Sequence, residues 1–210
     1  MAVSVKLKDV RLSFPNLWVP KAHPSKPEAL RFDASFLVEP GSANDKLIQG
    51  AILEAATEKL GKKAAAFLNS VKGNNMKYCY TQGDLKNYNG YAGMLVLASH
   101  RRAQDGPPLV IHNYHVPLSE QLEGRKYTEP SDPSGPRFLK LTAEDGKPYA
   151  GCYVNASVDI YVQDDINGGV RCGLKGVQFA RDGDAFSGSA AAKPDDFEAI
   201  EDGAQAGGLL

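Results

Sequence analysis

Tyrosine and basic side chains are interleaved through the middle and later parts of this 210-residue chain, a combination that suits an unpaired nucleic-acid strand. Unstacked bases stack on aromatic rings, at about 1–3 kcal/mol for each base, while lysine and arginine pair with the phosphates. Every base has a flat π face, so these contacts need no particular base sequence. The candidate residues are Tyr78, Tyr80, Tyr88, Tyr91, Arg101, Arg102, Tyr114, Arg137, Lys140, Tyr153, Tyr161, Arg171 and Lys175.

The sharpest pattern lies in residues 152–180, where apolar side chains at alternate positions predict a long strand and its return partner. The residues between the apolar positions must then face outward, and these include Tyr153, Tyr161, Arg171 and Lys175. Two rings and two cations would share one exposed face. Tyrosine is also common on half-exposed strands, and basic residues keep surfaces soluble. On this pattern alone, an ordinary solvated surface is the favoured interpretation.

The C-terminal end differs in charge from the rest of the chain. Five of the 25 acidic residues and none of the 24 basic ones follow Pro194, so residues 1–193 carry 24 basic and 20 acidic side chains. A flexible acidic segment can occupy a basic groove, be displaced by nucleic acid, or dock on partner proteins, although a merely solvating tail is the plain alternative. The candidate regulatory residues are Asp195, Asp196, Phe197, Glu198, Ile200, Glu201 and Asp202.

Strands account for most of the expected structure. The parity of the first strand changes near Asp9, which indicates a β-bulge. The turn at residues 104–106 predicts that the strands before and after it pair as a hairpin. The expected strands cover residues 3–14, 32–38, 91–99, 109–114, 152–162 and 170–179, with a short one around 76–80.

One helical insertion, at about residues 44–72, interrupts these strands. Long loops are expected over 15–27, which is rich in proline, and over 117–136. A mainly β fold with a helical insertion predicts an OB-like β-barrel, and a β-sandwich is nearly as compatible. We expect one domain over residues 1–183, followed by a flexible linker and acidic tail over 184–210.

Three stretches of the chain are more distinctive than the rest. They are residues 10–18, residues 151–164 and, the most specific, residues 176–186, Gly-Val-Gln-Phe-Ala-Arg-Asp-Gly-Asp-Ala-Phe. All three resemble a phage family of single-stranded-DNA-binding proteins. The resemblance spans essentially residues 3–188. It implies an OB-fold protein that coats single-stranded DNA in phage replication or recombination, largely without sequence preference, with an acidic tail for autoinhibition and partner recruitment. It implies no individual DNA contacts, so the candidate residues rest on parity and charge.

Two other classes of function remain open at this point. A metal-dependent nuclease needs clustered carboxylates, and the available ones are Asp159, Asp164, Asp165, Asp182 and Asp184. Asp164 and Asp165 flank a turn, while Asp182 and Asp184 lie where the domain is expected to end, so solvated roles are favoured. A virion or adaptor protein would explain the strands, but not a basic and aromatic surface beside an acidic tail.

The cysteines and the apolar stretches of the chain bear on its cofactors and its location in the cell. Cys79, Cys152 and Cys172 are scattered, so neither a disulfide framework nor a zinc site is expected. We expect no metal and no cofactor. No apolar stretch approaches the roughly 20 residues that span a bilayer, and the N-terminus alternates like a strand. The expected location is therefore the host-cell cytoplasm, with no membrane partner; a homo-oligomer is left open.

Overall fold

The computed structural model describes residues 2–23, 26–117, 123–128, 137–165 and 168–186. The acidic tail and most of the loop expected over 117–136 lie outside these ranges. None of the described helices is long and apolar enough to cross a membrane.

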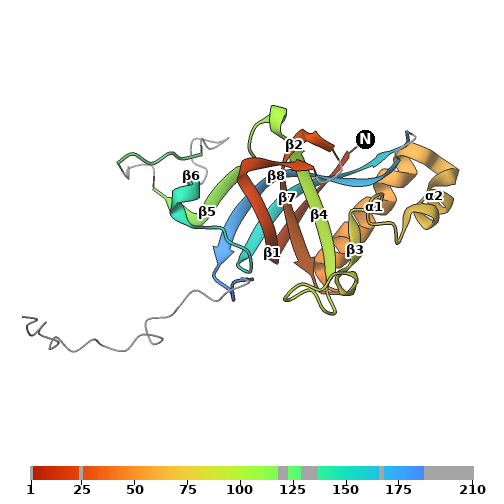
Figure 1. The fold of residues 1–210 in the computed structure, drawn as a ribbon, viewed down its shortest axis with the longest axis horizontal. Helices are drawn as coiled ribbons and strands as arrows, with labels where there is room; N and C mark the ends of the chain where they lie inside the picture. Colours follow the sequence, from red (N-terminus) through yellow and green to blue (C-terminus); the bar gives the residue numbers. More distant parts are fainter. Residues whose placement is uncertain (1, 24–25, 118–122, 129–136, 166–167, 187–210) are drawn as a thin grey trace, which may run out of the picture.

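Within the described residues, five strands close into a barrel (Figure 1). They are β1 (Ala2–His23), β2 (Lys26–Val38), β4 (Leu95–Arg102), β7 (Tyr153–Gln163) and β8 (Gly169–Arg181). β1 pairs antiparallel with both β2 and β7, β2 with β4, and β7 with β8. A parallel contact between His100 and Gly173 joins β4 to β8 and closes the ring. A small five-stranded barrel of this kind is OB-like, so the predicted barrel is confirmed in preference to the sandwich.

The remaining elements surround the barrel. The predicted helical insertion is confirmed as α1 (Ala43–Leu60) and α2 (Ala64–Val71), joined by a turn of 3-10 helix at Gly61–Lys63. The Ser42 hydroxyl caps α1 by accepting a hydrogen bond from the Asp45 amide, and α1 packs its buried side chains into the barrel core. β3 (Tyr80–Gln82) pairs with β4. β5 (Leu109–Val116) and β6 (Arg137–Lys140) form an arm that continues from β8.

β-Bulges bend the barrel strands. The pairing of β1 with β7 shifts between Leu7 and Val10, and Asp9 between them has a positive φ of 51°. The bulge predicted near Asp9 is therefore confirmed. A second shift opposes Ser157 to Gly176 but Val158 to Leu174. Such extra residues increase the local twist of a strand, which helps a short sheet close on itself.

The loop predicted over residues 15–27 is wrong for most of its length. β1 continues to His23 and β2 begins at Lys26, and their pairing is irregular, with register shifts after Ser13 and after Asn16. Beyond Leu12, β1 leaves β7 and pairs with β2 alone, so it has become an edge strand. Proline lacks an amide hydrogen and is tolerated on such an edge, which is why a proline-rich segment forms a strand here.

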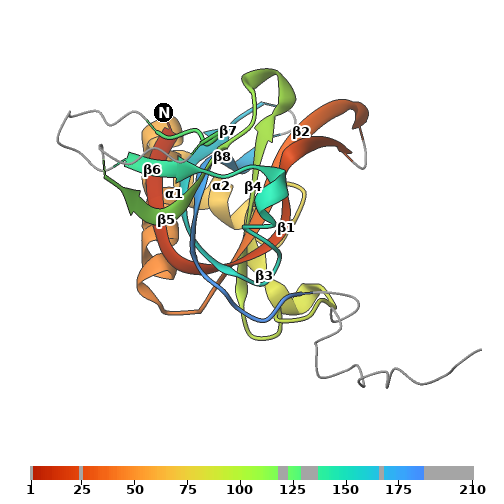
Figure 2. The same ribbon diagram turned by 90° about the vertical axis from the view of Figure 1, so that its left-hand side faces the viewer.

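The hairpin predicted between residues 91–99 and 109–114 is also wrong. Both β4 and β5 run parallel to β8, β4 meeting it at Gly173 and β5 at Gly176 to Gln178. After the turn at residues 103–106 the chain continues in the same direction along the same edge of β8, so β4 and β5 do not pair with each other. This loop and the far part of the β1–β2 hairpin project beyond the barrel on the same side (Figures 1 and 2).

Candidate nucleic-acid interface

Burial separates the predicted tyrosines into two groups. Tyr78 and Tyr80 are buried, and the Tyr80 hydroxyl donates a hydrogen bond of 2.9 Å to the Asp45 carboxylate. Burial raises the pKa of Tyr80, and the nearby carboxylate raises it further. Tyr91 is also buried, with no exposed surface. A buried ring offers no face to a base, so the structure removes these three tyrosines from the candidate DNA contacts.

The outward orientation predicted for Tyr153 and Tyr161 is confirmed by the alternating burial along β7. The two rings nevertheless differ in their surroundings. The Arg181 guanidinium lies 3.4 Å from the centroid of the Tyr153 ring, and Arg11 lies 5.9 Å from it. Tyr153 is therefore already stacked on the protein's own cations, and a base would have to displace them.

Tyr161 lies beside Gly173 and directly opposite Arg171 of β8. A Cβ on Gly173 would lie 3.9 Å from the Tyr161 ring, so the residue beneath this part of the ring is the smallest one available. Burial raises the pKa of the Tyr161 hydroxyl, while the positive charges of Arg171 and Arg102 oppose that rise. A half-buried ring with positive charges nearby is the arrangement expected for stacking on a base whose phosphates are held close to it.

Three cations form a row across β1, β2 and β4. Lys21 pairs in register with Arg31, and Arg31 pairs with Arg102. Directly opposed residues of antiparallel strands project to the same face, and like charges there are destabilising unless they are balanced. The balance comes from Asp33, 3.7 Å from the Arg31 guanidinium, and from Asp105 beside Arg102. We call Lys21, Arg31 and Arg102 the cation row.

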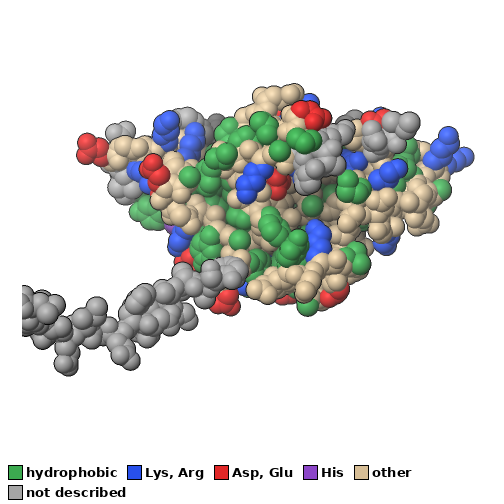
Figure 3. Space-filling view, in the orientation of Figure 1, with side chains coloured by type: hydrophobic (Ala, Val, Ile, Leu, Met, Phe, Trp, Pro, Cys, Tyr) green, Lys and Arg blue, Asp and Glu red, His purple; other side chains and the backbone are tan. Residues whose placement is uncertain are grey.

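An aromatic groove begins at the Lys21 end of this row. Phe14 is 46% exposed and Tyr88 is 52% exposed, and their ring centroids lie 5.0 Å apart at an interplanar angle of 70°. With Tyr91, Phe186 and Lys21 they line a cavity of about 550 Å³. Figure 3, which views this side of the molecule, shows hydrophobic side chains around a hollow over β1, β2 and β4, with lysine and arginine among them.

Sequence reasoning missed Phe14 and Phe186 as site residues. Phe14 continues the apolar alternation of Val10 and Leu12, and this alternation predicts that its ring faces the core. Its backbone adopts a positive φ of 48°, which turns the ring outward while Ser13 becomes buried. Phe186 ends the stretch that most resembles the phage family, and this position is the signal by which it could have been found.

The arginines after β4 hold their own loop. Arg101 donates hydrogen bonds to the carbonyl oxygens of Gly106 and Asp105, at 2.8 and 2.6 Å. Arg102 makes a two-point ion pair with the Asp105 carboxylate, at 2.9 and 3.0 Å. A phosphate could replace Asp105 as the partner of Arg102, because this pair is exposed to solvent. Arg101 instead bonds to main-chain oxygens, and its role here is to shape the loop.

The other predicted residues lie elsewhere. Tyr114, Arg137 and Lys140 belong to the β5–β6 arm, away from β2 and β4 in Figure 1. The Arg137 guanidinium stacks 4.3 Å from the centre of the Tyr127 ring. Lys175 forms an ion pair with Asp159 at 3.4 Å. The structure therefore does not bring the three residues of the arm onto the face that carries the cation row, while Lys175 lies on the outer surface of β8 and is held by Asp159.

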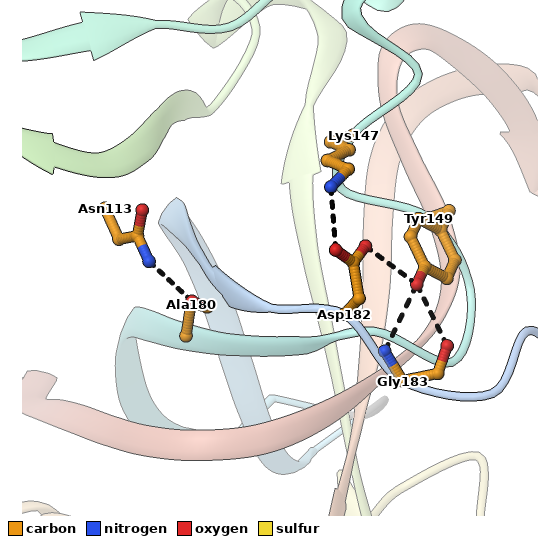
Figure 4. A network of polar contacts seen from close by, with 6 residues as sticks. All are labelled: Asn113, Lys147, Tyr149, Ala180, Asp182 and Gly183. Atoms are coloured by element: carbon orange, nitrogen blue, oxygen red, sulfur yellow. Dashed lines mark hydrogen bonds and ion pairs between the residues drawn. The ribbon is translucent and has the colours of Figure 1, made fainter.

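A network of polar contacts fastens the C-terminal end of the described chain (Figure 4). Asp182 accepts from the Lys147 ammonium at 2.9 Å, and the Tyr149 hydroxyl lies 3.0 Å from the same carboxylate. The hydrogen bonds from Lys147 and Tyr149 lower the pKa of Asp182. Arg11 donates to the Asp184 carbonyl at 2.8 Å and stacks 4.3 Å from the centre of the Phe186 ring. Phe186 is thereby held in the wall of the aromatic groove.

The carboxylates considered for a nuclease are dispersed. Asp159 pairs with Lys175, Asp164 with Lys59 at 3.3 Å, and Asp182 with Lys147. In the part of the chain that the structure describes, no three His, Cys, Asp or Glu side chains are grouped to hold a metal ion.

An OB-like barrel that presents cations and exposed rings on one strand face defines a nucleic-acid-binding module. The chain belongs to the family of the single-stranded-DNA-binding protein of Enterobacter phage Enc34, whose model matches residues 3–207. Protein p50 of Acyrthosiphon pisum secondary endosymbiont phage 1 is 37% identical over 199 residues, which cover 93% of each chain. These findings confirm the resemblance seen in the sequence.

Solved structures of the phage Enc34 protein share the fold. The complex of that protein with single-stranded DNA aligns with a TM-score of 0.61 at 16% identity, over 88% of this chain and 89% of the other. Another structure of the Enc34 protein aligns with a TM-score of 0.58 at 16% identity, over 93% of this chain and 90% of the other. The family consists of binding proteins and not enzymes, which decides against the nuclease and the virion scaffold.

Proposed function

We propose that this protein binds single-stranded DNA on the face formed by β1, β2 and β4, and coats it during phage DNA replication or recombination. The observation that carries the proposal is the cation row, with the exposed rings of Phe14 and Tyr88 beside Lys21 and the half-buried ring of Tyr161 within electrostatic reach of Arg102. OB-folds use this strand face for oligonucleotides. Membership of the Enc34 family supports the same ligand.

The geometry favours contacts that ignore base sequence. Neighbouring strands lie about 4.8 Å apart, so the row from Lys21 to Arg102 extends over about 10 Å. The DNA phosphates would bind along the cation row, and the bases would stack on the rings near it. Such contacts read the backbone and the π faces, which all nucleotides share.

A salt titration tests this function. The full chain should bind fluorescent oligo-dT and a mixed-sequence oligonucleotide with similar affinity. Its log affinity should fall with log salt at about −0.7 for each neutralised phosphate, so the cation row alone would contribute a slope of about −2. A chain that binds neither oligonucleotide, or whose affinity does not change with salt, contradicts the proposal.

We further propose that the acidic tail competes with DNA for this face. The described chain ends at Phe186 in the aromatic groove, and the acids begin at Asp195, so the tail is tethered beside the site that it would occupy. Its apolar residues Phe197 and Ile200 are proposed to contact replication or recombination proteins. The proposed setting is the host-cell cytoplasm.

Deletion of residues 194–210 should strengthen oligo-dT binding several-fold at about 0.01 M salt, where the Debye length is about 30 Å, and much less at 1 M, where it is about 3 Å. The matched control keeps the tail's length and replaces its five acids by Asn and Gln. That variant should behave like the deletion, because charge is the proposed cause. If both variants bind as the full chain does at low salt, the tail is not a competitor.

A further inference from the structure

We propose that the aromatic groove is a pocket for one unstacked nucleobase, which inserts against Phe14 and Tyr88. This inference rests on the proposed function and adds to it the place where a base, and not a phosphate, is held. The cavity of about 550 Å³ has room for one base of either size with its sugar. Three features of the groove support a preformed binding site: the strained backbone of Phe14 at its mouth, a rigid floor and wall, and a polar rim with little charge.

The strain lies at Phe14. A bulky residue with a φ of 48° occupies a backbone region that L-residues rarely adopt, and such strain persists where the surrounding structure imposes it, often at ligand sites. Its effect here is to present a large apolar ring to solvent beside another exposed ring, Tyr88. The strained backbone and the exposed apolar ring both raise the free energy of the protein without DNA. A base that stacks on these rings covers the surface that the strain exposes.

The floor of the groove is rigid. The ring of Tyr91 lies 5.3 Å from Tyr88 and 6.4 Å from Phe14, and its hydroxyl bonds to the Ser13 hydroxyl at 3.1 Å. Beneath it, Tyr91 packs on Leu37 and Val96 of the barrel. The loop that carries Tyr88 and Tyr91 is therefore anchored before any ligand arrives.

The wall is fixed as firmly. Arg11 stacks 4.3 Å from the centre of the Phe186 ring, and a Cβ at Gly90 would come within 2.5 Å of the same ring. Gly90 also has a positive φ of 76°, so glycine is required there on both grounds. A pocket held in its binding shape loses little entropy when the ligand enters.

The rim matches a neutral base attached to a phosphate. Among the described residues that line the groove, Lys21 carries the only charge, and it belongs to the cation row. Asn16 already donates its amide to Asp33, at 3.0 Å. Asn87 and Asn89 are exposed, and their amides both donate and accept hydrogen bonds, which suits the edge of any base.

The test places 2-aminopurine at successive single positions of an oligo-dT bound to the full chain. Its fluorescence should change sharply at one position in each binding site, and this change should disappear in Phe14→Gly and Tyr88→Ala. Each substitution should weaken oligo-dT binding about 5- to 150-fold, the range found for a stacked base. Tyr114→Ala is the matched control, since its ring is 48% exposed on the β5–β6 arm, and it should change neither readout.

Phe14→Gly distinguishes a binding ring from a structural one. Glycine adopts the positive φ without strain, so this variant should melt at the same temperature as the parent or higher while it binds DNA more weakly. A ring that merely packed would lower the melting temperature when removed. An oligonucleotide with one abasic site at the responsive position should lose affinity for the parent but not for Phe14→Gly.

Failure of this inference is distinguishable from failure of the proposed function. If the parent binds oligo-dT but no 2-aminopurine position responds, or if the abasic site weakens the parent and Phe14→Gly equally, the base pocket is wrong and the DNA face stands. If the parent does not bind oligo-dT, the proposed function is wrong, and this inference with it.

Discussion

Reversal of two charges in the cation row, in the double variant Arg31→Glu/Arg102→Glu, should weaken oligo-dT binding by about a hundredfold at 0.1 M salt. Arg31 and Arg102 are directly opposed on β2 and β4, so the change places two carboxylates where a phosphate is proposed to lie. The variant should also flatten the salt dependence, with the slope of log affinity against log salt falling by about 0.7 for each lost phosphate contact. Fluorescence anisotropy at several salt concentrations measures both quantities.

The control for this variant is Lys62→Glu/Lys63→Glu. These two lysines are exposed on the turn between α1 and α2, so the control changes the net charge by the same amount at a distance from the β2–β4 face. We expect it to lower affinity only slightly, through long-range electrostatics. If both double variants lose affinity equally, the net charge of the domain governs binding and the cation row has no special role.

Tyr161→Ala should reduce the affinity for oligo-dT about 5- to 150-fold, because a base loses its stacking partner. Tyr161→Phe keeps the ring and should bind as the parent does. The ring is half-buried and lies beside Gly173, so its removal should leave the barrel folded. Affinity is to be normalised to the folded fraction, measured by circular dichroism during thermal unfolding.

Tyr153→Ala provides the comparison within the same strand face. The Tyr153 ring is stacked by Arg181 and approached by Arg11, and Arg11 also holds Asp184 and Phe186. Removal of the Tyr153 ring should therefore lower the melting temperature more than Tyr161→Ala does, and it should lower the DNA affinity less. The opposite ranking, with Tyr153→Ala the weaker binder and the more stable fold, would show that Tyr153 is the stacking residue.

The two tyrosines show how far sequence reasoning reaches. Alternation with a period of two is a local property of a strand, so the outward orientation of both rings followed from the residues of β7 alone. The guanidinium groups that cover Tyr153 belong to Arg11 of β1 and Arg181 at the end of β8. These residues are 142 and 28 positions away in the chain, but their strands flank β7 in the sheet. No local pattern distinguishes a ring stacked by its own protein from one open to a base.

Tyr80 and Tyr91 illustrate the opposite error. Both were predicted as DNA contacts, Tyr80 at the end of the short strand expected around residues 76–80 and Tyr91 at the start of the strand expected over 91–99. The structure buries Tyr80, the first residue of β3, against the start of α1, and buries Tyr91 against Leu37 and Val96. The segment between them leaves Tyr88 exposed. Burial was decided by contacts distant in the chain, which the segment itself does not encode.

Several features of this protein were determined by its sequence alone: the β-rich class, the helical insertion, the bulge near Asp9, the outward faces of β7, and the acidic composition of the C-terminal end. Each follows from local periodicity, backbone preference or charge. The tertiary structure decided the rest. Closure through His100 and Gly173 set β4 and β5 along one edge of β8, and pairing of β1, β2 and β4 aligned Lys21, Arg31 and Arg102. The physical reason is that register between distant strands is chosen by the packing of the whole barrel.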